Sequence, residues 1–323
     1  MVSKTVFIDG EAGTTGLGIR ARLEAVPEIT LLHLPEGERK ENAARRAAMA
    51  AADLVILCLP DQAAREAVAL ATDLRADLGA GAPRLLDAST AHRTAPGWVY
   101  GFPELAAGQA AAIAGAALVA NPGCYATGAI ALLRPLVERG LIAPDMALSI
   151  HAVSGYSGGG RMMIAAHEAA GGPAFELYAL GLEHKHVPEI IRYAGLAQRP
   201  LFVPAVGHFR QGMLVSIPLF LDTLPGRPAA ADLRAALARH YRDAALITVS
   251  SDGTGDKLAA ETPRESDRMT LHVFAHERHR QAVLVAHLDN LGKGASGAAV
   301  QNARLMLGLP ALTQDAKELA DVR

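Results

Sequence analysis

A cysteine follows a proline–glycine turn in the segment Asn121–Gly128, which reads NPGCYATG. A helix-like apolar pattern continues from Cys124 to about Arg139, although Pro135 predicts a kink or a division into two pieces. The thiol therefore lies at the predicted start of a helix, where the positive end of the helix dipole favours a thiolate. This position indicates a nucleophilic Cys124.

The second cysteine, Cys58, has a different setting. It lies within the apolar run 54–59, which is typical of a buried strand, so we predict an inert core thiol. Two cysteines are too few for a disulfide framework, and they lack the spacing of metal ligands. We expect two thiols in a reducing cytoplasm, with one disulfide as the alternative.

Histidines that could exchange protons with the thiol occur in the segment Glu183–Glu189, EHKHVPE. Proline followed by an acidic residue suits the first turn of a helix, which places His184 and His186 in the loop before it. Two histidines at this spacing could also bind a metal ion. No convincing third ligand accompanies them, so no metal site is predicted.

Two further segments have residue types that bind anions. Ser89–Thr94 contains Arg93 and follows an apolar run, at the sheet edge where ligands of parallel sheets bind. Ser154–Arg161, SGYSGGGR, combines flexible glycine backbone with a guanidinium. Each segment taken alone is more often an ordinary loop than a site. Together with Cys124, the two segments indicate a substrate that carries carboxylate and phosphate groups.

A glycine-rich turn, Gly10–Gly16, follows the first apolar run and opens a helical segment. Its backbone amides and the helix N-terminus would suit a pyrophosphate, although the spacing is GxxGxxG and not GxGxxG. The second apolar run ends at His33–Pro35, and Arg39 and Lys40 follow, which favours the 2′-phosphate of NADP. A turn without a ligand and a solvated charged loop are the alternatives.

The elements that must position these residues divide the chain into two parts, with a boundary near residues 121–125. In the first part, strand-like runs alternate with helical segments, which predicts a Rossmann-type doubly wound parallel sheet. The strands are expected at 5–9, 29–34, 54–59, 84–87 and 118–120, and the helices at 15–25, 43–52 and 61–78.

The second part predicts an α+β domain with a mixed or antiparallel sheet whose open face lies at an interface. Its strands are expected at 147–153, 200–206, 213–221, 269–275 and 282–288, before a last helix at 294–307.

Length and composition agree with this division, because 323 residues suffice for about two domains. The 31 Lys and Arg residues against 33 Asp and Glu give no basic face, so we expect no nucleic-acid partner. No apolar stretch reaches the ~18 residues of a membrane span, and the start lacks the apolar region of a signal peptide. We expect a cytoplasmic protein without a membrane partner.

Together these motifs resemble the short bacterial form of the N-acetyl-gamma-glutamyl-phosphate reductases, in the semialdehyde dehydrogenase superfamily. The resemblance covers nearly the whole chain, and its segments are GEAGTTG from Gly10, CLPD from Cys58, NPGCYATG from Asn121, SGYSGGGR from Ser154, EHKHVPEI from Glu183 and DNLGKGASGAAVQN from Asp289. It implies NADPH-dependent reduction of N-acetyl-gamma-glutamyl phosphate to the 5-semialdehyde in arginine biosynthesis, through a thioester on Cys124.

The resemblance also implies a fold like that of glyceraldehyde-phosphate dehydrogenase. Residues 1–123 and 290–323 would form the NADP-binding domain, and residues 124–289 the catalytic domain of a homodimer or homotetramer. His186 would be the acid/base, with His184 able to exchange roles with it. The expected substrate-binding residues are Arg93, Ser154, Arg161, His184 and Arg210, and the expected cofactor-binding residues are Gly10, Gly13, Thr14, Thr15, Gly16, Arg39, Lys40, Pro60, Asn290 and Gly292.

Other functions stay open at this point. A related acyl phosphate, of the aminoadipyl or aspartyl type, would use the same motifs. An alcohol dehydrogenase would use His186 without a thioester, and a non-catalytic sensor would bind NADP without a reactive Cys124.

Overall fold

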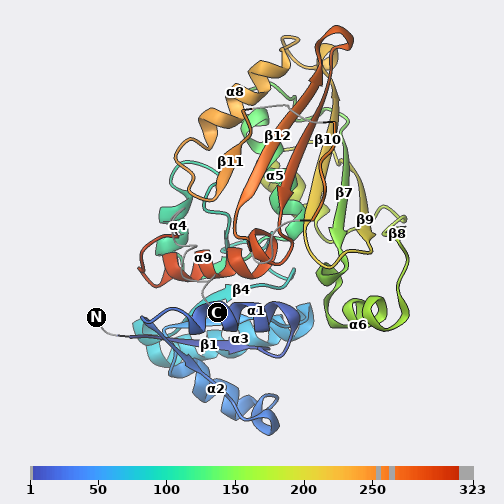
Figure 1. The fold of residues 1–323 in the computed structure, drawn as a ribbon. Coiled ribbons are helices and arrows are strands. Elements are labelled where there is room, and N and C mark those ends of the chain that lie inside the picture. The colour runs from blue at the N-terminus through green and yellow to red at the C-terminus, as the bar shows by residue number, and fades with distance from the viewer. Residues whose placement is uncertain (1–2, 252–255, 262–265, 313–323) are drawn as a thin grey trace. The chain divides into compact units, whose positions relative to one another are not determined.

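The computed structural model describes residues 3–251, 256–261 and 266–312. Within them the chain forms two compact units, one built from the chain up to Pro122 together with residues 295–311, and one from residues 123–294. Figure 1 shows their helices and strands.

The first unit contains a six-stranded sheet in which every pairing between neighbours is parallel. Its strand order is β2 (Ile29–Leu32), β1 (Lys4–Asp9), β3 (Leu54–Leu57), β4 (Arg84–Asp87), β6 (Leu118–Ala120) and β5 (Val99–Tyr100). The doubly wound parallel sheet predicted from the sequence is confirmed.

Helices cover both faces of this sheet, because successive strand residues point to opposite sides and both sides are apolar. One face packs on α1 (Thr14–Glu24), α4 (Gln109–Gly115) and α9 (Gly297–Met306). The other packs on α2 (Asn42–Ala50) and α3 (Asp61–Leu78). The late helix α9 thus shares a core with β1 at the start of the chain, since Val300 and Met306 lie in the same cluster as Val6.

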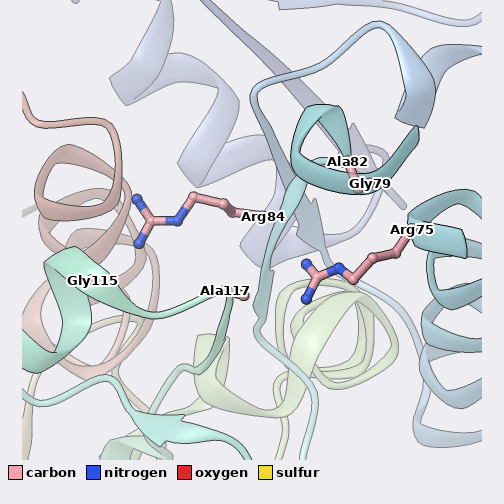
Figure 2. A pocket seen from close by; sticks show the side chains of 6 residues that line it. All are labelled: Arg75, Gly79, Ala82, Arg84, Gly115 and Ala117. Carbon is pink, nitrogen blue, oxygen red and sulfur yellow. The ribbon is translucent and has the colours of Figure 1, made fainter.

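A cavity of about 300 Å³ lies at the start of β4, between the C-terminal ends of α3 and α4. Figure 2 shows Arg75 and Arg84 as the charged residues that line it. The Arg84 guanidinium donates to the carbonyls of Ala114 at 2.7 Å and Ala116 at 2.8 Å, and also to that of Met306. Arg84 therefore caps the C-terminal ends of α4 and α9, where carbonyls lack partners within the helix.

The second unit contains a seven-stranded mixed sheet. Its order is β11 (Ile247–Val249), β12 (Met269–His276), β13 (Gln281–Leu288), β10 (Met213–Phe220), β7 (Ser149–Gly155), β9 (Leu201–Gly207) and β8 (Phe175–Leu177). The β11–β12 and β7–β9 pairings are parallel and the others are antiparallel. The predicted mixed sheet is confirmed.

One face of this sheet is covered by α5 (Cys124–Glu138) and α8 (Ala230–His240), and α7 (Val187–Ala194) packs on α5. The opposite face keeps apolar side chains exposed, among them Phe220 at 63% and Val283 at 37%. α6 (Gly160–Ala170) follows the short helical turn η3 (Tyr156–Gly159). The other short helical turns are η1 (Glu36–Glu38), η2 (Gly79–Gly81), η4 (Leu221–Thr223), η5 (Glu277–His279) and η6 (Gly292–Ser296).

The helix that begins at Cys124 is one continuous element, so the predicted alternative of two pieces is wrong. Pro135 lacks the N–H that would bond to the carbonyl of Ala131 one turn earlier. The hydroxyl of Tyr241 donates to that carbonyl at 2.9 Å instead. This tertiary contact satisfies the carbonyl that the proline leaves open.

Several predicted bounds shift by a few residues. β2 and β3 each end two residues early, and the predicted last helix begins instead with the π-type turn η6, followed by α9. Among the described residues, no helix is both long and apolar enough to cross a membrane.

Candidate active site

Cys124 is the first residue of α5, directly after the N-cap residue Gly123. The Gly123 carbonyl accepts the backbone N–H of Thr127 at 2.8 Å and its hydroxyl at 3.0 Å, so the first helical turn is firmly closed. The Cys124 side chain is partly buried. Backbone also passes close to it, because a Cβ on Gly294 would lie 3.0 Å from the Cys124 Cβ. The predicted placement of this thiol at a helix N-terminus is confirmed.

A carboxylate that sequence reasoning missed as a functional group lies beside this turn. Glu189 is 1% exposed, and its Oε2 accepts the backbone N–H of Gly123 at 3.1 Å. Its Oε1 lies 4.0 Å from Nε2 of His186. One buried carboxylate therefore contacts both the residue before Cys124 and an imidazole. The signal in the sequence was the i, i+3 spacing of His186 and Glu189, which places both on one helix face.

His186 directly precedes α7 and is 4% exposed, and Pro188 and Glu189 occupy the first turn of that helix, as predicted. His184 precedes it in the loop, and its Nδ1 accepts the backbone N–H of His186 at 3.1 Å. The two rings lie edge to face with centroids 4.6 Å apart. The two histidines therefore differ in their contacts. His184 accepts the backbone hydrogen bond from His186, and His186 lies beside the Glu189 carboxylate.

Two tyrosines complete this cluster. The Tyr178 hydroxyl lies 3.3 Å from Nε2 of His184, and the Tyr125 ring lies 5.8 Å from the His186 ring between centroids. Burial raises the pKa of both tyrosines well above their ordinary value, and the nearby Cys124 contributes in the same direction. Both hydroxyls therefore stay protonated at neutral pH.

The predicted substrate-binding residues of the second unit fall into two groups. Ser154 is 2% exposed near the end of β7, and its hydroxyl interacts with Tyr125, so it belongs to the cluster around Cys124. Arg161 is exposed in the first turn of α6. Arg210 is half-exposed and forms an ion pair with Glu168 of α6. The structure thus brings Ser154 and His184 to the thiol's neighbourhood, whereas the two arginines are associated with α6.

Arg93 belongs to the first unit and is buried there. Its Nε donates to the backbone carbonyl of Asn121 at 3.0 Å. The side chain of Asn121 donates to the Ala295 carbonyl at 3.1 Å and accepts from Asn302 at 3.0 Å. These contacts hold the chain just before the proline–glycine turn that carries Cys124.

The glycine-rich turn after β1 has the geometry of a phosphate site. Gly10 has φ +88°, and a Cβ there would lie 2.4 Å from the Cys58 carbonyl oxygen, so only glycine fits. The first N–H groups of α1 lack partners within the helix by geometry. The Thr14 hydroxyl oxygen is buried and has no hydrogen-bond partner within the described part of the chain. A pyrophosphate would satisfy these donors.

The other predicted residues of this turn lie with it, whereas Asn290 and Gly292 belong to the second unit. Gly13, Thr14, Thr15 and Gly16 form the N-cap and first turn of α1. Pro60 is the exposed N-cap residue of α3. Asn290 is buried, donates to the Ser157 hydroxyl at 2.9 Å and accepts the Gly212 N–H at 2.8 Å, and Gly292 opens η6.

A buried carboxylate also lies beside the residues predicted to bind a 2′-phosphate. Glu11 is 6% exposed, and its oxygens lie 2.8 Å from the Arg39 guanidinium and 3.0 Å from Nδ1 of His33. Arg39 also donates to the Leu34 carbonyl at 3.2 Å, whereas Lys40 is exposed. Glu11 was missed because the GxxGxxG pattern leaves the residue types between Gly10 and Gly13 unspecified.

Cys58 contrasts with Cys124. It packs against the core of the parallel sheet, and burial, with Asp87 and Asp9 nearby, raises the pKa of Cys58 to about 12. Among the described residues, no group of three or more His, Cys, Asp or Glu side chains could hold a metal ion.

The chain is similar to a known domain family and to known proteins. Residues 124–290 match the semialdehyde dehydrogenase dimerisation domain. An N-acetyl-gamma-glutamyl-phosphate reductase 2 of Pseudomonas putida is 52% identical over 95% of this chain and 98% of its own length. An N-acetyl-gamma-glutamyl-phosphate reductase of Burkholderia cenocepacia is 51% identical over 94% of this chain and 97% of its own length.

Solved structures extend the likeness at the level of the fold. Aspartate semialdehyde dehydrogenase II of Vibrio cholerae has a TM-score of 0.68 with 16% identity, and covers 95% of this chain and 99% of its own. The Candida albicans aspartate semialdehyde dehydrogenase, solved with NADP, has a TM-score of 0.64 with 16% identity, and covers 94% of this chain and 98% of its own.

Proposed function

The chain belongs to the N-acetyl-gamma-glutamyl-phosphate reductase family, and on that premise we propose how its residues carry out the reaction. The reaction is the NADPH-dependent reduction of N-acetyl-gamma-glutamyl phosphate to N-acetylglutamate 5-semialdehyde with release of phosphate, in arginine biosynthesis. The observation that supports our residue assignments most is the contact of Glu189 with both Gly123 and His186.

The first chemical step takes place at Cys124. Its thiolate attacks the carbonyl carbon of the acyl phosphate, the carbon–oxygen bond to phosphate breaks, and a thioester forms on the sulfur. The carbonyl oxygen of the substrate gains negative charge in this step. The backbone N–H groups in the first turn of α5, next to Cys124 in the sequence, would donate hydrogen bonds to it. Pro122 and Gly123 supply the turn that presents the sulfur.

The second step releases the aldehyde. NADPH, when bound, supplies the hydride that reduces the thioester carbonyl. His186 protonates the carbonyl oxygen as negative charge develops on it, and takes that proton back when the carbon–sulfur bond breaks and the thiolate leaves. The Glu189 carboxylate at 4.0 Å stabilises the protonated imidazole before the first of these proton transfers and after the second.

The first unit fits NADP(H) through its own residues. The N-terminal amides of α1 and the buried Thr14 hydroxyl would hold the pyrophosphate, with Gly10, Gly13, Thr15 and Gly16 shaping the turn. Arg39, with Lys40 after it, would hold the 2′-phosphate.

Running the reaction backwards tests the mechanism. With N-acetylglutamate 5-semialdehyde and NADP⁺, we expect NADPH formation that requires phosphate or arsenate and is abolished in Cys124→Ser. Turnover without phosphate, or turnover that survives Cys124→Ala, would indicate a dehydrogenase without a thioester. Preference for the substrate with one more methylene would instead assign the aminoadipyl type.

The second unit supports a homodimer formed through the uncovered face of its sheet. Residues 124–290 match a dimerisation domain, and this face exposes Leu201, Phe220 and Val283. We expect the wild type to elute as a dimer, or as a tetramer if a further contact exists, and Val283→Asp as a monomer in light scattering. Arg278→Asp, on the exposed turn η5, is the control that should leave the assembly intact.

A further inference from the structure

The protonation of His184 follows from its contacts. Its Nδ1 accepts the backbone N–H of His186 at 3.1 Å, and a ring nitrogen that accepts a hydrogen bond carries no proton. The neutral ring therefore carries its proton on Nε2. That nitrogen lies 3.3 Å from the Tyr178 hydroxyl, so the Nε2–H donates to the phenol oxygen.

Tyr178 is held in place for this contact. Its backbone N–H donates to the Pro204 carbonyl at 3.2 Å, just after β8 pairs with β9. Its hydroxyl also interacts with Tyr125, whose own hydroxyl donates to the Ala205 carbonyl at 2.9 Å. Because burial raises the pKa of Tyr178, the hydroxyl keeps its proton. The acceptor for His184 is thus a neutral group fixed to β9.

The consequence for His184 is that both ring nitrogens are used in positioning. Its backbone carbonyl also accepts the N–H of Val187 at 3.0 Å, so ring and backbone together fix the turn that opens α7. If the ring moved its proton to Nδ1, an N–H would face the N–H of His186 and the turn would open. In the described part of the chain, the titratable side chains whose rings contact the His184 ring include Tyr178, Tyr125 and His186.

We propose that Tyr178 is a positioning residue that fixes the tautomer of His184, so that His184 orients His186 and takes no part in proton transfer. The proposal rests on the function proposed above. It assigns the acid/base role to His186 alone, whereas the sequence left open that His184 could exchange roles with it. Tyr178 was not among the predicted site residues, because four residues separate it from the motif that begins at Glu183.

A set of matched variants of the full-length enzyme tests this role. In His184→Asn the amide oxygen can take the place of Nδ1, whereas in His184→Gln the amide lies nearer the position of Nε2. We expect kcat to fall about threefold in the first variant and roughly tenfold or more in the second. Tyr178→Phe should lower kcat roughly tenfold with KM changed less than about twofold, and Tyr193→Phe, on α7, should match the wild type.

A spectroscopic measurement separates positioning from activity. The ¹⁵N chemical shifts of the His184 ring should show an Nε2-protonated imidazole in the wild type and a mixture of tautomers in Tyr178→Phe. This readout needs no substrate, so it stands even if the enzyme reduces a different acyl phosphate.

Two results would overturn the proposal. If His184→Asn is as inactive as His186→Asn, His184 transfers protons itself. If the ring shifts of His184 are the same in the wild type and in Tyr178→Phe, then Tyr178 does not fix the tautomer.

Discussion

At the residue scale, the two cysteines form an internal comparison. Since the pKa of Cys58 is about 12, only roughly one Cys58 thiol in ten thousand is ionised at pH 8. Iodoacetamide at pH 8 should therefore modify Cys124 and leave Cys58 intact, because the thiolate is the reactive form. Peptide mass spectrometry of the native protein measures both sites.

The control for this labelling is the same reaction in denaturant, where both cysteines should react. Equal labelling of Cys58 and Cys124 in the native protein would show that the core around β3 does not shield the thiol.

Glu189 provides a second prediction at this scale. Glu189→Gln keeps an oxygen for the Gly123 N–H but removes the negative charge 4.0 Å from His186. We expect kcat to fall about tenfold with little change in KM, since a buried charge pair is weakly screened. Glu183→Gln, an exposed glutamate of the same motif, is the control. Equal kcat values for the two variants would contradict a role for the Glu189 charge.

The sequence was informative about residues whose chemistry is local. Cys124 and His186 follow from a turn and a helix start, and both placements are confirmed by the structure. Glu189, Tyr178 and Glu11 were missed as functional groups, because each depends on a contact with a segment distant in the sequence: Glu189 with Gly123, Tyr178 with Pro204 and Glu11 with Arg39. The spacing along the chain indicates only the local pair of His186 and Glu189.

At the scale of elements, Arg84 extends from β4 and donates hydrogen bonds to carbonyls at the C-terminal ends of α4 and α9. Arg84→Met should lower the free energy of unfolding by about 2 kcal/mol, because several carbonyls of α4 and α9 lose a charged donor. Arg75→Met is the matched control, since Arg75 lines the same cavity but, within the described residues, its guanidinium makes one longer bond, 3.3 Å to the Pro83 carbonyl. Urea denaturation of the two variants gives the comparison, and equal losses would refute the capping role.

Helices and strands were predicted best where buried side chains give the sequence a clear hydrophobic pattern. β4 and β6 were predicted with their observed bounds, because short apolar runs are typical of strands covered on both faces. α6, α8 and β8 were not predicted. The three residues of β8 are all exposed, so pairing with β9 defines that strand and no hydrophobic pattern does.

At the scale of the whole molecule, the pH dependence of stability is expected to reflect His272 and His287 on adjacent strands. Burial lowers the pKa of both, and His287 lowers that of His272 further. Below the ordinary value of about 6.5, the unfolded chain therefore binds more protons than the folded one. The stability due to the neutral rings is fully present above pH 6.5 and is lost as the pH falls through the folded-state pKa values.

Urea midpoints measured between pH 7.5 and 5.5 test this expectation. The wild type should lose stability over this range, and the double variant His272→Gln, His287→Gln should lose less. His279→Gln, on an exposed turn, should follow the wild type. If the double variant follows the wild type as well, other groups control the acid limb.

The return of the chain to its first unit has a consequence for biosynthesis. Ribosomes deliver the protein from its N-terminus, yet Val300 and Met306 of α9 complete the core built on β1. The core of the first unit therefore stays incomplete when the first 122 residues have emerged. The apolar sheet face that α9 later covers remains exposed while about 170 further residues are translated. A nascent chain stalled before residue 295 should recruit a chaperone such as trigger factor, and one released after α9 should not.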